Sequence, residues 1–198
     1  MKRKLRTNPP TLYYDEIKLR PLRYRDGSTW KKLRSTNKAW LREWDATLPP
    51  TDENYPATFS QMVWQGRRDA RKKIHLMWGI EYKKKLIGIV TAGNITLGSS
   101  RNCYIGYWLS KSQAGQGIMP ISVALVLDFI FQELKLHRVE IAIRPENTAS
   151  LRVVEKLKLE LEGVRRSYIH INGDWRDHQV FVVVEDEVTT SFLERLKN

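Results

Sequence analysis

The sequence predicts an α+β fold built around one mixed β-sheet, and three observations predict it. The chain has 198 residues, of which 41% are hydrophobic, which is enough for one well-buried core. Its helical and strand patterns follow the order strand, two helices, three strands, a glycine junction, helix, strand, helix and two strands, which is no regular βαβ winding. The last two strands flank Asn172-Gly173, a strong signal for a tight hairpin turn.

Residues 16–110 are expected to form a strand and two helices before a group of three strands. Apolar side chains at helical spacing indicate the helices, and β-rich runs between short polar turns indicate a meander. Three prolines in a polar stretch indicate a loop between the helices. In order, we expect a strand at residues 16–23, helices at 26–44 and 59–73 joined by a loop at 48–58, and strands at 74–82, 85–96 and 102–110.

The second half predicts two helices and three strands around the hairpin turn. One helix, over residues 120–134, starts with Pro120, whose missing N–H costs nothing in a first turn. The other, over residues 145–159, has Asn147 or Thr148 as its cap and apolar side chains along one stripe. The strands are expected at residues 137–144, 162–171 and 176–186, and a short amphipathic tail follows at 187–198.

The chain is strongly basic, with a formal net charge of +12. Such an excess attracts polyanions, namely nucleic acid, a nucleotide cofactor or a membrane surface, although a solvated basic face also explains it. The basic start lacks the apolar stretch of a secretory signal, and the longest apolar stretch, residues 121–134, is too short to span a bilayer. One cysteine, Cys103, suits a reducing compartment. We therefore expect a soluble, cytoplasmic protein with no membrane partner, and the histidine spacing predicts no metal.

Two glycines, Gly115 and Gly117, mark the junction between the meander and the first apolar helix. A helix start offers unpaired N–H groups and the positive end of the helix dipole, and glycine lets a phosphate approach the backbone. The junction is not a Walker loop, because no Lys-Ser or Lys-Thr follows, and it lacks the third glycine of a dinucleotide fingerprint. Either it binds an anion, or the glycines simply turn the chain.

About thirty residues later, a second block of residues gives the junction its context. Its residues are Asn147 and Ser150, then Glu155-Lys156-Leu157, Glu162-Gly163, and Asn172-Gly173 with Trp175 and Asp177. With this block the chain resembles the GNAT acetyltransferase superfamily, and within it the ribosomal-protein alanine N-acetyltransferases of the Rim type. The family's phosphate motif, Arg/Gln-x-x-Gly-x-Gly/Ala, falls on residues 114–119, where Gly117 matches and Ala114 and Met119 depart. The resemblance covers residues 16–185; its C-terminal half is specific and its N-terminal half is a match of element order.

The resemblance implies a fold and a donor substrate. The fold is a GNAT fold, a twisted mixed sheet flanked by helices on both faces, in a single N-acetyltransferase domain over residues 1–198, with its core at 16–185, a short basic N-terminal arm and a C-terminal tail. The donor is acetyl-CoA, with its diphosphate on the glycine junction, its pantetheine along the last meander strand as an added strand, and a hydrogen bond from Asn147. The implied cofactor-binding residues are Trp108, Leu109, Ala114, Gly115, Gln116, Gly117, Ile118, Met119 and Asn147.

The implied chemistry is direct attack of an amine on the thioester in a ternary complex, which needs a base and a proton for the leaving thiolate. Many relatives place a tyrosine acid seven residues after the asparagine, but Val154 stands there, and the Rim pattern implies Ser150 instead. Glu140, on the strand beside the gap, and Asp177 are the candidate bases. The alternatives are that Ser150 caps or packs its helix and that Glu140 pairs with Arg138 or Arg144.

The acceptor side is expected to involve the two N-terminal helices and the final hairpin. The expected acceptor-binding residues are Trp40, Trp44, Tyr168, Trp175 and Asp177, although tryptophan and tyrosine are more often core residues. The resemblance implies the N-terminal alanine of a ribosomal protein as acceptor, and the basic surface fits contact with the ribosome and its rRNA. One alternative is a small amine such as an antibiotic or polyamine, attracted by Asp52 and Glu53. Another is a non-enzymatic RNA- or ribosome-binding module.

Overall fold

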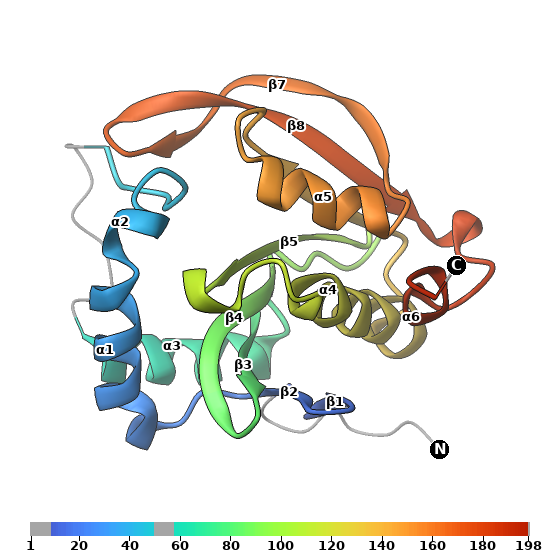
Figure 1. The fold of residues 1–198 in the computed structure, drawn as a ribbon. Helices are drawn as coiled ribbons and strands as arrows, with labels where there is room; N and C mark the ends of the chain where they lie inside the picture. The colour runs from blue at the N-terminus through green and yellow to red at the C-terminus, as the bar shows by residue number, and fades with distance from the viewer. Residues whose placement is uncertain (1–8, 50–57, 198) are drawn as a thin grey trace.

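The computed structural model describes residues 9–49 and 58–197. The basic N-terminal arm, most of the loop expected at residues 48–58, and the two acidic residues Asp52 and Glu53 lie outside these ranges. Within them, one sheet of eight strands has the order β1-β2-β3-β4-β5-β6-β8-β7 (Figure 1). The strands are β1 (Leu12–Tyr14), β2 (Ile17–Arg20), β3 (Leu76–Tyr82), β4 (Lys85–Gly93), β5 (Asn102–Leu109), β6 (Arg138–Ile143), β7 (Glu160–Ile171) and β8 (Asp174–Val184).

The sheet is mixed, because all neighbouring strands run antiparallel except β5 and β6, which run parallel. A parallel pair needs a crossover between its strands, and the longest apolar helix provides it. The expected meander is confirmed as β3, β4 and β5, and the hairpin around Asn172-Gly173 is confirmed as β7 and β8. The helices are α1 (Gly27–Thr36), α2 (Lys38–Leu41), α3 (Phe59–Lys72), α4 (Ile118–Phe129), α5 (Thr148–Lys156) and α6 (Phe192–Arg195).

Helices cover both faces of the sheet, as the sequence predicted. Along β3, Trp78 and Ile80 enter the large core that α4 and α5 close, whereas Met77 faces the smaller core beneath α1 and α3. This alternation is the two-residue period of a strand buried on both faces. Trp78 is completely buried, and its indole N–H donates to the Pro10 carbonyl over 2.7 Å, so the largest core side chain keeps its polar atom satisfied.

Three expected elements differ from the structure. The strand expected at residues 16–23 is present as the shorter β2, and β1 precedes it in an unexpected hairpin, because Asp15 adopts a positive φ of 46° and reverses the chain. The helix expected at residues 26–44 breaks at Asn37 (φ −104°, ψ 10°) into α1 and α2. The helix expected from Pro120 begins two residues earlier and ends in a π-turn, Ile130–Leu134.

The C-terminal tail docks through α6. Phe192 is completely buried and stacks on Phe131, with ring centroids 5.9 Å apart, while the Asp128 carboxylate accepts from the Phe192 N–H over 2.8 Å. The Asp128 side chain thus satisfies a donor at the start of α6, although it comes from α4. The amphipathic pattern at residues 187–198 therefore reflects packing on α4.

A buried ion pair fixes the segment that leads from β2 into α1, and it predicts a pH-dependent stability. Arg20 contacts Asp26 over 2.8 Å and Glu81 over 2.7 Å. Burial alone would raise the pKa of Asp26, but hydrogen bonds from Arg20 and from the Arg23 N–H outweigh it and hold that pKa below its usual range. The stabilisation is present in full above about pH 4 and is lost as the pH falls through the lowered pKa.

We expect Asp26→Asn to lower the free energy of unfolding by about 3 kcal/mol at pH 7.

Urea unfolding at pH 7 and at about pH 3 measures this effect, and the cost of Asp26→Asn should shrink at the lower pH. Glu16→Gln is the control, because its carboxylate pairs with Lys83 at a solvent-exposed position and should contribute little. Equal effects of the two substitutions, or a cost for Asp26→Asn that does not change with pH, would contradict the prediction.

Candidate active site

A gap between β5 and β6 creates the site. The two strands pair only through residues 102–104 and 138–140, and then they diverge. Beyond Tyr104, β5 has no strand partner on its β6 side, whereas β4 still pairs with it as far as Leu109. Apart from the Leu109 carbonyl, the backbone groups on that edge of β5 have no partner among the described residues, so they can pair with an extended ligand. In Figure 1, α2, α5 and the start of α4 surround the end of β5.

The end of β5 is held away from β6 by the first helices. The indole N–H of Trp40, on α2, donates to the Leu109 carbonyl over 3.1 Å. The Asn37 side chain, at the break between α1 and α2, accepts from the Lys111 N–H over 2.9 Å and from the Ser110 hydroxyl over 3.2 Å. Asn37 is buried, so these bonds fix the chain just before the glycine junction.

Two cavities open along the gap. We call the first the loop cavity, because residues 113–120 form one of its walls and residues of α5 form another. It encloses about 230 Å³. The sequence-predicted residues that line it are Trp40, Trp44, Trp108, Leu109, Ala114, Gly115, Gly117, Ile118, Met119, Asn147 and Ser150. Gln116 does not line it, because its side-chain amide turns back to the Ser112 carbonyl over 3.1 Å.

The glycine junction has the geometry of an anion cradle. Gly115 and Gly117 have φ values of +81° and +76°, in the left-handed region that favours glycine, and a Cβ added at either would point into open space. Gly117 is the N-cap of α4, and no side chain caps that helix start. The first N–H groups of α4 thus lack a side-chain partner beside the cavity, which is the arrangement that a diphosphate fits.

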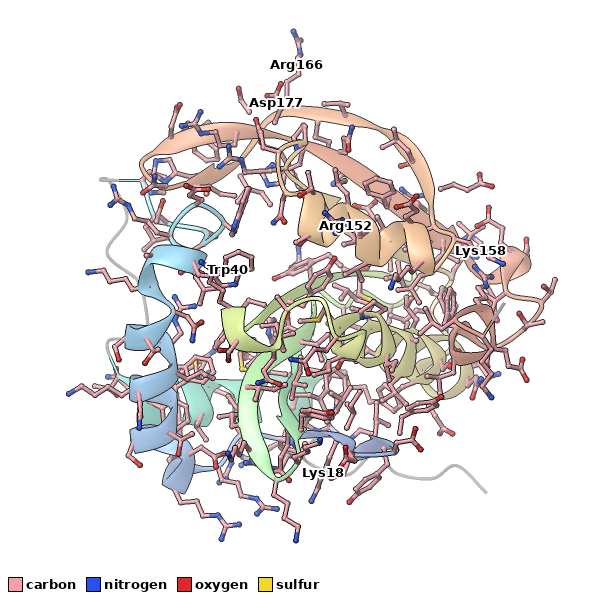
Figure 2. The ribbon with its side chains drawn as sticks, viewed as in Figure 1. Lys18, Trp40, Arg152, Lys158, Arg166 and Asp177 are labelled. Carbon is pink, nitrogen blue, oxygen red and sulfur yellow. The ribbon has the colours of Figure 1, made fainter. Side chains whose placement is uncertain are left out.

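Two basic side chains that sequence reasoning missed line the same cavity. Arg152 and Lys156 lie four residues apart on α5 and therefore share one helix face. Neither forms an ion pair within the described residues. Figure 2 shows Arg152 on α5 and Trp40 on α2, on two sides of the opening. The four-residue spacing of these two basic residues in the helix that carries Ser150 was the signal available in the sequence. Their side chains add positive charge to the cavity, which Ala114 cannot supply.

Ser150 lies where the two cavities meet. Its backbone N–H is capped by the Asn147 side chain over 3.1 Å, which confirms Asn147 as the cap of α5. The Ser150 hydroxyl makes no hydrogen bond to a described residue, in contrast to the Ser122 hydroxyl, which donates to the Ile118 carbonyl over 2.8 Å. The Ser150 carbonyl accepts from Tyr107, whose pKa burial raises far above its usual value. Ser150 therefore presents a free hydroxyl to the gap.

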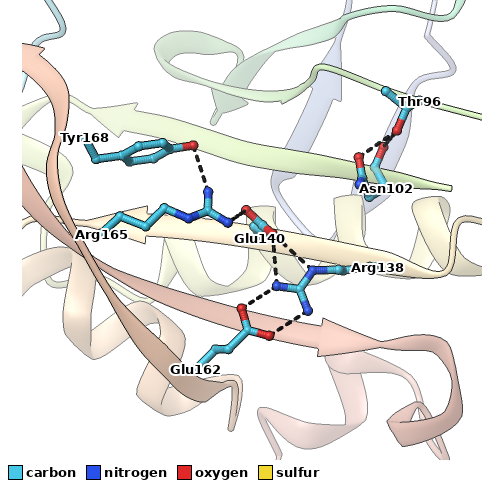
Figure 3. A network of polar contacts seen from close by, with 7 residues as sticks. All are labelled: Thr96, Asn102, Arg138, Glu140, Glu162, Arg165 and Tyr168. Atoms are coloured by element: carbon cyan, nitrogen blue, oxygen red, sulfur yellow. Dashed lines mark hydrogen bonds and ion pairs between the residues drawn. The ribbon is translucent and has the colours of Figure 1, made fainter. Parts of the chain in front are cut away.

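Glu140, which the sequence suggested as a candidate base, lies outside both cavities. It lies on the face of β6 opposite Val139, as the alternation predicted, but it lines neither cavity. Its two carboxylate oxygens pair with Arg138 over 3.0 Å and with Arg165 over 2.8 Å (Figure 3). Arg138 pairs in turn with Glu162, so Glu140 is the centre of an ion-pair network.

The hairpin residues expected on the acceptor side also lie outside both cavities. Asp177 accepts from the Ser167 N–H over 2.7 Å and sits with Arg166 at the outer edge of β7 and β8 (Figure 2). The Tyr168 hydroxyl accepts from Arg165 over 2.9 Å, and Trp175 is 52% exposed. Of the expected acceptor residues, the structure brings only Trp40 and Trp44 to the gap.

We call the second cavity the strand cavity, because the diverging β5 and β6 and the facing β7 form its walls. Most of its lining is apolar, including Leu41, Ile89, Ile105, Ile141, Ile143 and Ile169. The charged residues among its lining are Asp45 and Arg144, and the Asp45 carboxylate is paired with Arg34. His178 also lines it, and sequence reasoning gave it no role.

The described residues give little support for a metal site, a reactive cysteine or a membrane-spanning helix. No group of three or more His, Cys, Asp or Glu in residues 9–49 and 58–197 is arranged to hold a metal ion. Cys103 is buried in β5, and burial raises its pKa to about 12, so it stays a thiol at neutral pH. No helix in the described part of the chain is long and apolar enough to cross a membrane.

Comparison with known proteins agrees with this geometry. Residues 16–160 match the family model of the acetyltransferase (GNAT) domain. The chain is 33% identical to "Probable N-acetyltransferase YjcK" of Bacillus subtilis, over 86% of this chain and 95% of the relative. It is 27% identical to the ribosomal protein uS5-alanine N-acetyltransferase of Escherichia coli, over 87% and 91% of the two chains.

Among solved structures, it superposes with a TM-score of 0.86 on Mycobacterium smegmatis RimJ in complex with CoA-disulfide, at 31% identity and over 95% and 92% of the two chains. The family match covers most of the chain, and this structural relative was solved in complex with CoA-disulfide. The chain belongs to the GNAT acetyltransferase family and is an acetyl-CoA-dependent N-acetyltransferase.

Proposed function

We propose that this chain is a cytoplasmic, Rim-type enzyme that acetylates the N-terminal alanine of a protein, with a ribosomal protein as the favoured acceptor. The observation that carries the proposal is the strand cavity, which is apolar and offers a polycation no unpaired carboxylate within the described residues. The similarity to a ribosomal-protein alanine acetyltransferase supports it. The net charge of +12 supports contact with rRNA near the acceptor.

The loop cavity is proposed to hold the donor. Acetyl-CoA supplies the acetyl group as a thioester. The backbone N–H groups of residues 115–119 receive the diphosphate, and the free cations of Arg152 and Lys156 add attraction for phosphate from α5. The open edge of β5 that leads to Trp108 and Leu109 pairs with the amides of the pantetheine arm, as an added strand does, while the Leu109 carbonyl stays bonded to Trp40.

Ser150 is proposed to assist departure of the thiol. Its hydroxyl lines both cavities and has no partner among the described residues, so it is available to donate to the leaving sulfur. The Asn147 amide oxygen already caps the Ser150 N–H, which leaves its NH₂ group to bind the pantetheine. Tyr107 holds the Ser150 carbonyl and stays protonated at neutral pH, so it positions the first turn of α5.

The strand cavity is proposed to hold the acceptor. Its apolar walls suit a small apolar side chain next to a single amine, which describes an N-terminal alanine. Polyamines and aminoglycosides carry several ammonium groups and need several unpaired acidic partners to bind. Asp45 is already paired with Arg34, and Arg144 is paired with Glu146 over 3.1 Å, so no carboxylate of the described lining is left without a partner. This balance favours a peptide N-terminus over a polycationic small molecule.

Substitution of Gly117 tests the placement of the diphosphate. We expect Gly117→Ala to weaken acetyl-CoA binding by about tenfold or more in calorimetry, because its Cβ would enter the open space that the phosphate occupies. Gly98→Ala is the matched control: Gly98 has a φ of +77°, an added Cβ there also meets nothing, and it lines neither cavity. Both variants carry the same backbone strain, so their melting temperatures should fall alike. Equal affinity of both variants would show that the diphosphate binds elsewhere.

Substitution of Ser150 tests its role in thiol departure. We expect Ser150→Ala to lower kcat by roughly a factor of 100 and to leave acetyl-CoA affinity within about twofold, because the hydroxyl acts on the leaving group. Thr148→Ala removes a hydroxyl from the same helix at a position that lines neither cavity, and it should keep wild-type kcat. Wild-type turnover of the Ser150 variant would remove this residue from the mechanism.

An acceptor screen tests the substrate class. Purified protein, acetyl-CoA and single acceptors are mixed, and free thiol is measured together with product mass. We expect alanine-initiated peptides to be acetylated at the α-amine and spermidine and aminoglycosides to remain unmodified, because the one carboxylate among the described lining residues, Asp45, is already paired with Arg34. Acetylation of the small amines alone would refute the proposed acceptor. Binding of acetyl-CoA without acetylation of any acceptor would favour a non-catalytic module.

A further inference from the structure

We propose that His178 is the general base of the reaction and that its Nε2 takes the proton of the attacking amine. The proposal deepens the proposed function by naming the group that removes this proton. It rests on that function for the location of the acceptor in the strand cavity, and it does not depend on which amine binds there.

His178 is placed where a base is needed. It lies on β8, on the same face as Val180, and its side chain lines the strand cavity although only 2% of the residue is exposed. Ser150 lines that cavity from α5. Ser150 reaches the cavity from α5 and His178 reaches it from β8, so an amine and a thioester that meet there have both a proton donor and a proton acceptor in the lining.

The hydrogen bond of His178 fixes its tautomer. Nδ1 lies 2.9 Å from the Arg176 carbonyl oxygen, and a carbonyl only accepts hydrogen bonds. Nδ1 therefore carries the proton of the neutral ring, and Nε2 carries the lone pair. No described residue forms a hydrogen bond with Nε2. The ring is held by its own strand in the orientation and tautomer that a base requires.

The surroundings keep the ring neutral at physiological pH. Burial lowers the pKa of His178, and Arg144 lowers it further, while Asp177 and Glu146 and the bond to the Arg176 carbonyl oppose the shift. From β7, Arg165 is its cross-strand neighbour and Tyr168 packs its ring edge against the imidazole. The Arg165 charge is balanced by Glu140 over 2.8 Å. A neutral ring is the form that accepts a proton.

The other ionisable groups near the gap are engaged. Asp45 is paired with Arg34, and the Tyr107 hydroxyl donates to the Ser150 carbonyl. His170 lies on the neighbouring strand, but its Nδ1 faces Thr47 and the residue lines neither cavity. Among the described residues that line the strand cavity, His178 is therefore the neutral group with a free lone pair.

The proton balance follows from these positions. Nε2 of His178 takes one proton from the acceptor nitrogen as the C–N bond forms and the C–S bond breaks, with the electron pair of that bond passing to sulfur. The Ser150 hydroxyl passes one proton to the sulfur and regains one from water, and the imidazolium of His178 returns its proton to water. The net products are one amide and one thiol.

Substitution of His178 tests the proposal in the whole protein. We expect His178→Gln to lower kcat/KM at pH 7 by about 100-fold and to leave acetyl-CoA affinity within about twofold. The wild-type pH profile of kcat/KM should rise through the lowered pKa of a histidine, and the variant should lose that inflection. His137→Gln, at an exposed position outside both cavities, is the control. The assay uses whichever amine the wild type acetylates, so a wrong acceptor assignment does not affect its outcome.

A measurement that does not use activity addresses the same residue in the wild-type protein. Imidazole nitrogen NMR at pH 7 should show His178 neutral, with the proton on Nδ1, and the Nε2 resonance should shift when an acetylated acceptor amine is added. The H178Q spectrum identifies the signals. A ring protonated on Nε2, a charged ring at pH 7, or an H178Q enzyme with wild-type kcat/KM and an unchanged pH profile would overturn the proposal while leaving the acetyltransferase function intact.

Discussion

The divergence of β5 and β6 is the constraint on which the rest of the structure depends. Parallel strands are usually joined by a helical crossover, and α4 provides it here, which places a helix start at the mouth of the gap. Because pairing stops after residues 102–104, β5 keeps a free edge, and both cavities open beside it. The position of the glycine junction, the open edge of β5 and the two cavities thus follow from one interrupted ladder.

The gap stays open because the first helices occupy the end of β5. Trp40 bonds the Leu109 carbonyl, and Asn37 bonds the start of the glycine junction. At Asn37 the backbone departs from regular helix geometry. The Asn37 side chain then accepts hydrogen bonds from the Ser110 hydroxyl and the Lys111 N–H, which are far along the sequence. The same short segment carries Trp44, which lines both cavities. Residues 37–44 therefore connect the wall of both cavities to the chain just before the glycine junction.

The sequence predicted those features of the site that depend on residues close together along the chain. Gly115, Gly117 and the Asn147 cap were predictable, because positive φ and helix starts depend on residues within a few positions. Glu140 and His178 were not, because each role depends on partners from other strands. The alternation of apolar and polar residues along β6 predicted on which face of the sheet Glu140 lies, but it did not predict the ion pair with Arg165. The break at Asn37 was missed for the same reason, since its partners lie more than seventy residues away.

The ion-pair network around Glu140 connects the fold to the chemistry even though Glu140 is outside the cavities. Arg165 faces His178 across the β7–β8 ladder, and an unpaired guanidinium there would add positive charge beside the imidazole. Glu140 neutralises Arg165 from β6, and Arg138 holds the other carboxylate oxygen in place. Burial is the main influence on the His178 pKa, which it lowers. Glu140, which the sequence suggested as a base, thus neutralises the guanidinium that neighbours His178 across the β7–β8 ladder.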